Sequence, residues 1–283
     1  MPSIKRLARF DVLKPVYTPS ADGVSGNLLV LFHGLGDTAA NFAKFGVRMQ
    51  LPQTAVCALT GPSPIPFFDE GTGWFPHFDD EGEGKLAWIA LEGDSENVAA
   101  AQMLTATRAL VVGFLAESVF ESESHRDGWP AERVFLLGFA QGGAAALDAA
   151  LLGTRPGADS APLQVGGVVS IGGWLEPARY AAGALDGAGA RRLAARQTRP
   201  HVLVTAGERD ETVAVSRVPA LVAALRGLVA APAQVAHEVV AGKPLAMPQS
   251  AGEMRAIVRF FADHLHLRNL ALEAMADVYE IKT

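Results

Sequence analysis

The chain has 283 residues, of which 49% are hydrophobic and 19% are charged, and its formal net charge is -6. A chain of this length and composition can bury one large core, so we expect a single domain. The acidic balance, without any run of lysine or arginine, excludes the basic surface that a nucleic-acid partner requires.

The cysteine content and the hydrophobic runs indicate in which cellular compartment the protein is expected. The single Cys57 lies in an apolar run, which excludes an intramolecular disulfide framework and indicates a core residue in a reducing compartment. We identify no run that is apolar enough to span a bilayer, and no apolar region follows the first basic residues. We therefore expect a cytoplasmic protein without a transmembrane segment.

The first third of the chain predicts two buried strands beside an edge strand. Residues 9–19 alternate loosely, as in an edge strand. The runs 27–32 and 54–59 are continuously apolar, as in strands that are covered on both faces. The first of these runs ends in the sequence His-Gly-Leu-Gly-Asp, where Asp37 or Thr38 can cap a helix.

Residues 65–94 are predicted to be irregular because prolines, glycines and acidic residues interrupt them. Such a long loop is usually functional or disordered, and its aromatic side chains indicate packing over another part of the molecule. These aromatics either close an edge of the core, which we favour, or form the wall of a pocket. A long helix is predicted at 95–119, and a polar connection follows it.

The stretch Val134-Phe-Leu-Leu-Gly-Phe-Ala-Gln-Gly-Gly143 has the pattern of a strand, a sharp turn and a helix. This is the pattern of a nucleophile elbow, in which a strained turn exposes a serine hydroxyl above the sheet. Here the central residue is Ala140, which has no hydroxyl.

The rest of the chain repeats the alternation of strand and helix, with strands at 165–171, 200–205 and 234–240 and helices at 213–229 and 250–265. This alternation predicts an α/β protein with a mostly parallel sheet and helices on both faces. The active region of such a sheet lies at the carboxyl ends of its strands.

Several motifs occur in matching order: HGLGD, GPSPIPF, GFAQGG, GGWLEP and AGERDETV. Together they resemble the acyl-protein thioesterases and the small carboxylesterases and phospholipases of the α/β-hydrolase fold. The resemblance covers residues 28–265, which we expect to form the hydrolase domain. Residues 1–27 are expected to be an edge segment, and residues 266–283 a helical C-terminal extension.

The resemblance implies a role for five positions. Backbone N–H groups of Leu35 and Gln141 would bind the oxyanion, and they do so whatever their side chains are. Asp210 matches the acid of a catalytic triad. Ala140 stands at the nucleophile position, and Met247, six residues before Glu253, stands at the histidine position. Nucleophile and general base are therefore both replaced.

None of the seven histidines is placed to substitute. His264 and His266 belong to the far end of the last helix, and His237 belongs to the middle of a strand. His33 is expected to make a structural hydrogen bond. Lys243 lies in the appropriate loop, but nothing in the sequence indicates the lowered pKa that a lysine base requires.

We therefore expect a pseudo-hydrolase that retains an oxyanion loop and binds a small apolar or acyl-ester ligand, or a protein partner. The alternative is an active serine esterase or thioesterase in which Ala140 has been introduced. Loss of both residues favours the first interpretation, because a single replacement suffices to inactivate a triad. We expect no metal and no cofactor, since the sequence lacks their spacing motifs. The candidate pocket residues are Phe67, Phe68, Trp74, Phe75 and Trp174.

Overall fold

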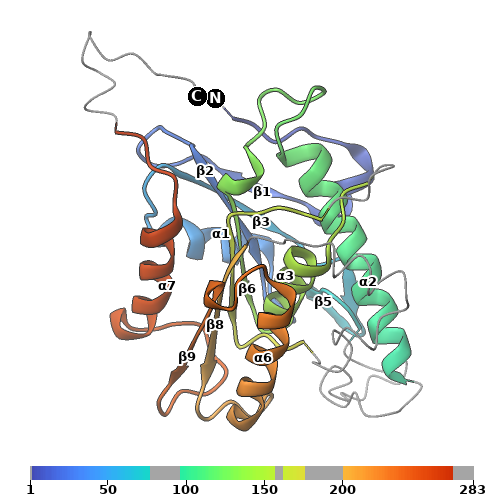
Figure 1. Cartoon of the computed structure of the whole chain (residues 1–283). Coiled ribbons are helices and arrows are strands. Elements are labelled where there is room, and N and C mark those ends of the chain that lie inside the picture. Colours follow the sequence, from blue (N-terminus) through green and yellow to red (C-terminus); the bar gives the residue numbers. More distant parts are fainter. Residues whose placement is uncertain (1, 77–95, 157–161, 176–199, 270–283) are drawn as a thin grey trace.

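The computed structural model describes residues 2–76, 96–156, 162–175 and 200–269. Its centre is a seven-stranded sheet with the strand order β1-β3-β2-β6-β7-β8-β9 (Figure 1). Only β1 and β3 pair antiparallel, and every other pair in this sheet is parallel. The strands are β1 (Val16–Thr18), β2 (Asn27–Phe32), β3 (Thr54–Leu59), β6 (Val134–Phe139), β7 (Gly167–Ile171), β8 (His201–Gly207) and β9 (Val235–Val240).

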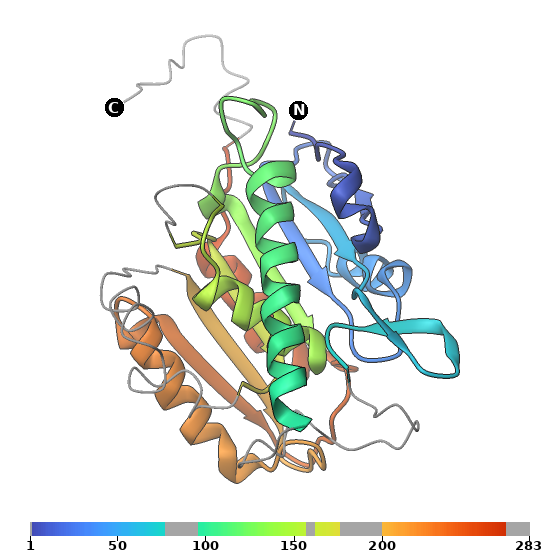
Figure 2. The ribbon, with the colours of Figure 1, turned by 90° about the vertical axis from the view of Figure 1, so that its right-hand side faces the viewer.

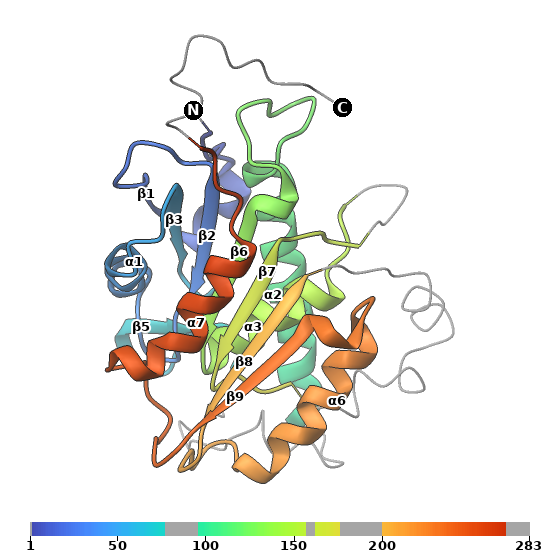
Figure 3. The same cartoon turned by 60° about the vertical axis from the view of Figure 1, so that its left-hand side comes forward.

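Helices cover both faces of the sheet, as the alternating pattern predicts. One face carries α1 (Ala39–Arg48) and α7 (Ala251–His264), and the other carries α2 (Glu96–Phe114), α3 (Gln141–Leu152) and α6 (Val218–Leu228) (Figure 3). Each layer encloses its own hydrophobic core. The central strands β2 and β3 are buried along their whole length, which explains their uninterrupted apolar sequences. The predicted α/β class is confirmed.

The predicted helix at 95–119 differs from the structure at its end. The α-helix α2 stops at Phe114, and Leu115–Val119 form a π-helical turn in which the N–H of Phe120 donates to the carbonyl of Leu115 at 2.8 Å. A π turn adds one residue to the turn without interrupting the apolar pattern, so periodicity alone does not detect it.

The prediction that residues 65–94 are irregular is wrong for the part that the structure describes. Strands β4 (Ser63–Ile65) and β5 (Phe68–Gly73) form an antiparallel hairpin, which lies beside the loop after β2. Gly71 permits this approach, because a Cβ atom there would lie 2.9 Å from the Cα of Gly36. Strand propensity misses β5 because contacts between backbones, and not apolar side chains, hold it in place.

The N-terminal edge segment contains less strand than predicted. A 3-10 helix spans Ala8–Leu13, and the edge strand is confined to β1. The helix buries Phe10 and Leu13 in the core. The apolar residues that the sequence pattern assigned to an edge strand therefore lie in this 3-10 helix.

After α7 the chain crosses to the starts of β2 and β3. The backbone N–H groups of His266 and Arg268 donate to the side-chain oxygens of Asn27 and Gln53 at 3.1 and 2.8 Å. Residues 270–283, where a helical extension is predicted, lie outside the described residues. In the described ranges, no helix is both long and apolar enough to cross a membrane. Burial raises the pKa of the Cys57 thiol to about 12, as expected of an unreactive core cysteine.

A stacked histidine pair joins β8 to the end of α7 and provides a pH test of this packing. The rings of His201 and His264 lie 3.8 Å apart. Burial lowers the pKa of both imidazoles, and the neighbouring His201 lowers that of His264 further. Below the usual histidine pKa, the unfolded chain therefore binds more protons than the folded chain.

We expect unfolding stability to be full above the usual histidine pKa and to fall as the pH drops from about 7.5 to about 5.5. His264→Phe should keep the ring contact and reduce this dependence. The matched control is His237→Phe, on the exposed part of β9. Urea unfolding midpoints at the two pH values measure the effect, and an unchanged pH dependence in His264→Phe would contradict it.

Candidate active site

The structure forms the predicted elbow, with Ala140 at its apex. Ala140 has φ 49° and ψ -116°, between the end of β6 and the start of α3. Its N–H donates to the carbonyl of Ile171 at 2.8 Å, which fixes the apex beside the end of β7. Gly138 allows strand and helix to cross closely, since a Cβ there would lie 2.6 Å from the nitrogen of Gly143.

The positive φ of Ala140 stores backbone strain, which is common at functional sites. Such strain costs roughly 1–3 kcal/mol for a residue with a Cβ, and glycine escapes it at a smaller entropic cost. We therefore expect Ala140→Gly to stabilise the fold by about 1 kcal/mol in urea unfolding. Ala144→Gly, inside α3 and with no positive φ, is the matched control and should destabilise. Destabilisation by both variants would argue against strain at the apex.

Gln141 directly follows the apex as the first residue of α3, and Leu35 lies in the loop after β2. Within the described parts of the chain, the backbone N–H groups of Leu35 and Gln141 donate no hydrogen bond to a carbonyl or a side chain. The two groups are available as donors. The N-terminus of α3 also favours negative charge there.

Side chains under the apex hold the two donor segments together. The side-chain oxygen of the buried Gln141 accepts from the N–H of Trp74 at 2.7 Å, and its amide donates to the carbonyl of Phe75 at 2.8 Å. The indole of Trp74 donates to the carbonyl of His33 at 2.8 Å. The loop after β2 and the start of α3 are thus connected through one buried network, which supports preorganised N–H groups.

His33 has the structural role that the sequence predicts. Its Nδ1 donates to the carbonyl of Gly34 at 2.7 Å, and its Nε2 accepts from the N–H of Gly61 at 2.9 Å. Burial lowers the pKa of this imidazole, which favours the neutral ring that this pattern of one donor and one acceptor needs. His33 is therefore fully engaged.

Asp210 lies close to the apex, and half of its carboxylate is without a partner. Oδ1 accepts from the N–H groups of Thr212 and Val213 at 2.8 and 2.9 Å, whereas Oδ2 is buried without a hydrogen bond in the described structure. A Cβ built on Gly172 would lie 3.6 Å from Oδ2. Gly172 directly follows Ile171, which binds the apex, so the structure brings Ala140 and Asp210 to the same strand end.

Leu245 and Asp210 both approach Gly172. A Cβ on Gly172 would overlap the Leu245 side chain, which lies on the same side as the free oxygen of Asp210. Met247 is partly buried against the core under α7. Sequence spacing did not identify Leu245, and no motif around it signals this contact. The histidine position at Met247 stays a prediction.

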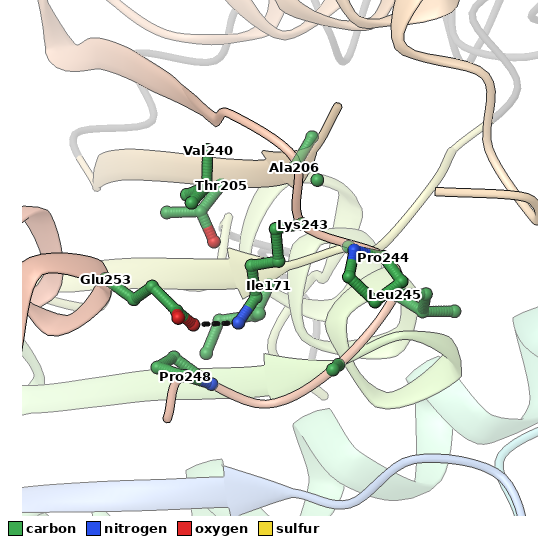
Figure 4. Close-up of a pocket in the computed structure, with 12 residues that line it drawn as sticks. Ile171, Thr205, Ala206, Val240, Lys243, Pro244, Leu245, Pro248 and Glu253 are labelled. Carbon is green, nitrogen blue, oxygen red and sulfur yellow. Dashed lines mark hydrogen bonds and ion pairs between the residues drawn. The ribbon is translucent and has the colours of Figure 1, made fainter. Parts of the chain in front are cut away.

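An ion pair fixes the loop that contains Leu245 and Met247. Figure 4 shows the Lys243 ammonium directed at the Glu253 carboxylate, with which it forms an ion pair. The same ammonium donates to the carbonyl of Met247 at 3.1 Å. The bond from Lys243 holds the pKa of Glu253 below its usual value. Lys243 is thereby occupied as a donor.

The space beside this loop is small. Its cavity, between the ends of β7 and β8 and residues 243–248, has a volume of about 10 Å³. That is about the room that one water needs, whereas ligand pockets usually enclose about 300–1,000 Å³. The cavity can admit a small polar group but not an acyl chain.

No histidine among the described residues forms a hydrogen bond with Asp210. His125 bonds to the carbonyl of Ser3 at 2.9 Å, and His201 and His264 stack on each other. His77 lies outside the described residues. Nor do the described ranges contain a group of three or more histidine, cysteine, aspartate or glutamate side chains that is arranged for a metal ion.

The five candidate pocket aromatics separate into two groups. Trp74, Phe75 and Trp174 are buried in the core under α2 and α3. Phe67 is 94% exposed and Phe68 is 40% exposed, at the turn of the β4–β5 hairpin. None of the five lines the small cavity at Lys243. A pocket wall formed by them stays a prediction.

Comparisons with known proteins agree with this geometry. The family model described as phospholipase/carboxylesterase matches residues 18–191, which include the loop after β2 and the elbow. An uncharacterized hydrolase from Mycosarcoma maydis is 34% identical over 160 residues, which are 56% of this chain and 52% of that protein. Another uncharacterized hydrolase, from Schizosaccharomyces pombe, is 30% identical over 156 residues, which are 53% of this chain and 54% of that protein. The chain thus spans about half the length of the curated relatives that it matches.

A solved structure extends the likeness to the whole fold. The crystal structure of Zea mays acyl-protein thioesterase 2 superposes with a TM-score of 0.63 at 18% identity, and the match covers 88% of this chain and 97% of that one. This likeness covers more of the chain than the family match does, and it establishes the fold alone. With a family match over more than half of its residues, this α/β-hydrolase-fold chain belongs to the phospholipase/carboxylesterase family.

Proposed function

We propose that this protein is a pseudo-hydrolase, which keeps the elbow and oxyanion geometry of its family but does not hydrolyse esters or thioesters at this site. The observation that carries the proposal is the apex of the elbow, where a strained backbone presents a methyl group and no hydroxyl. Without a nucleophile, the two N–H groups beside it have no tetrahedral intermediate to stabilise.

The free oxygen of Asp210 supports the same proposal. In a triad the acid accepts a hydrogen bond from the histidine and holds it in the correct tautomer. Here Oδ2 of Asp210 is buried without a partner among the described residues, and the apolar Leu245 lies beside the same glycine. A buried unpaired oxygen of this kind destabilises a fold by about 1–3 kcal/mol. It is consistent with a carboxylate that has lost its histidine.

The remaining capacity of the site is to bind, and its ligand is a small anion or carbonyl group at the N–H groups of Leu35 and Gln141. Backbone donors at the start of a helix attract negative charge irrespective of the side chain at the apex. The pair between Lys243 and Glu253 closes the neighbouring loop. The cavity there is too small for an acyl chain.

The direct test is reactivity of the full chain. We expect no labelling by a fluorophosphonate probe and no turnover of p-nitrophenyl acetate or butyrate above the rate with heat-unfolded protein. A variant with alanine at Asp210 should behave identically, because no triad depends on this carboxylate. Turnover that Asp210→Ala abolishes would overturn the proposal.

A further inference from the structure

A second cavity, far larger than the one beside Lys243, lies at the N-terminal segment. Its volume is about 620 Å³, within the range of about 300–1,000 Å³ that is usual for small-molecule sites. The N-terminal residues, the 3-10 helix Ala8–Leu13 and β1 form one side, and the end of α2 forms the other. Figure 2 shows the first residues, in dark blue, beside that end of α2.

The wall of this N-terminal cavity is largely apolar. Phe10 and Phe114 pack edge to face with their ring centroids 6.0 Å apart, and both are buried. Ile4 and Leu7 are partly buried against the same core. Tyr17 is 39% exposed and completes the wall from β1. Such a surface suits a hydrocarbon chain.

The N-terminal cavity also contains a polar group that the protein leaves unsatisfied. Ser118 lies in the π turn, is fully buried, and lines the cavity. Its Oγ has no hydrogen-bond partner within the described part of the chain. A buried hydroxyl without a partner is costly, and π turns occur frequently at functional sites. This oxygen is itself buried, so it does not face the open part of the cavity.

The charged side chains that line this cavity favour an anion. They are Lys5, Arg6 and Lys14, against a single carboxylate, Asp11. Arg6 already pairs with Asp11 at 3.3 Å. Lys5 donates to a backbone carbonyl at 3.4 Å, and Lys14 makes no ion pair in the described ranges. Two ammonium groups therefore remain uncompensated, in a protein whose net charge is -6.

We propose that the N-terminal cavity binds a monomeric long-chain fatty carboxylate. The alkyl chain lies against Leu7, Phe10 and Phe114. The carboxylate is held by the ammonium groups of Lys5 and Lys14. The backbone N–H of Lys5 donates to the carbonyl of Ser118 at 2.8 Å, which fixes the main chain of Lys5 against the end of α2. This site is separate from the elbow and does not depend on catalysis there.

The test uses isothermal titration calorimetry of the full chain with dodecanoate below its micelle concentration. Dodecanoate should bind one per chain, and the neutral dodecanol should bind at least about tenfold more weakly, a difference of about 1.4 kcal/mol. Lys5→Glu/Lys14→Glu should weaken dodecanoate binding by a similar factor or more. Lys44→Glu, on the exposed side of α1, is the matched charge control and should change nothing.

Leu7→Trp, which fills the N-terminal cavity, should abolish binding, and its thermal midpoint establishes that it is folded. If Leu7→Trp does not fold, the double variant Lys5→Glu/Lys14→Glu still tests the proposal. Undiminished binding by folded Leu7→Trp would place the ligand elsewhere and overturn the proposal. Equal affinity for dodecanol, or an equal loss in Lys44→Glu, would also overturn it. So would binding to phosphatidylglycerol vesicles without any binding of monomeric dodecanoate, because that result assigns this face to a membrane.

Discussion

Placing a serine at the elbow together with a histidine beside Asp210 should convert this protein into an esterase, whereas either change alone should not. Triad members act as a unit, so one restored member leaves turnover near background. A positioned general base contributes roughly 10²–10⁴-fold. We therefore expect the combined variant to exceed Ala140→Ser by at least about 10²-fold in kcat/KM for p-nitrophenyl butyrate.

Two histidine positions compete in this experiment. Sequence spacing favours Met247→His, whereas in the structure Leu245 and the unpaired Oδ2 of Asp210 both approach Gly172. We expect Ala140→Ser/Leu245→His to be the more active pair, because Leu245 and the unpaired Oδ2 of Asp210 both lie beside Gly172. A larger gain from Ala140→Ser/Met247→His would return the histidine position to Met247.

The acid provides the control. Adding Asp210→Asn to the more active pair should reduce turnover severely, because an amide in place of the acid favours the wrong histidine tautomer. If Ala140→Ser alone hydrolysed the substrate as fast as either pair, a residue outside the predicted loop would be acting as the general base. Fluorophosphonate labelling of each variant reports whether the new serine is activated, independently of substrate binding.

Adding one methyl group to Gly142 should strongly destabilise the protein, although alanine is the better helix former. A Cβ at this position of α3 would overlap the carbonyl oxygens of Phe32 and His33 and lie 2.6 Å from the carbonyl carbon of Phe32. These are backbone atoms at the end of β2, and they cannot move aside as a side chain would. We expect Gly142→Ala to cost about 3 kcal/mol or more, at the upper end of overpacking effects.

Gly227→Ala in α6 is the matched control. Both glycines lie in helices, but a Cβ at 227 would meet nothing within 4 Å. The intrinsic preference for alanine should then appear as a gain of roughly 0.5–1 kcal/mol. Urea unfolding of the two variants measures the difference. A loss below 1 kcal/mol in Gly142→Ala would mean that α3 and β2 are less closely packed than the structure has them.

The sequence predicted most of the fold because local patterns encode it. The buried strands at 27–32 and 54–59 have the predicted bounds, since uninterrupted apolar runs occur where a strand is covered on both faces. The elbow was also evident, because close crossing of strand and helix tolerates only glycine at positions such as Gly138. In contrast, β5 was missed, because its stability comes from backbone contacts with the loop after β2.

The sequence by itself determined the class of fold, the absence of a hydroxyl at Ala140 and the presence of an acid at Asp210. These are properties of residue types in order along the chain. Only the tertiary structure decided that Leu245 and Asp210 both approach Gly172, that the Gln141 side chain bonds to Trp74 and Phe75, and that Ser118 and Lys5 line one cavity. Each of these contacts joins residues far apart in the chain, and their identities alone do not specify which side chain packs against which. In the stretch from Val134 to Gly143, the structure therefore adds a defined geometry to a missing hydroxyl: the apex is strained, and the N–H groups of Leu35 and Gln141 have no partner among the described residues.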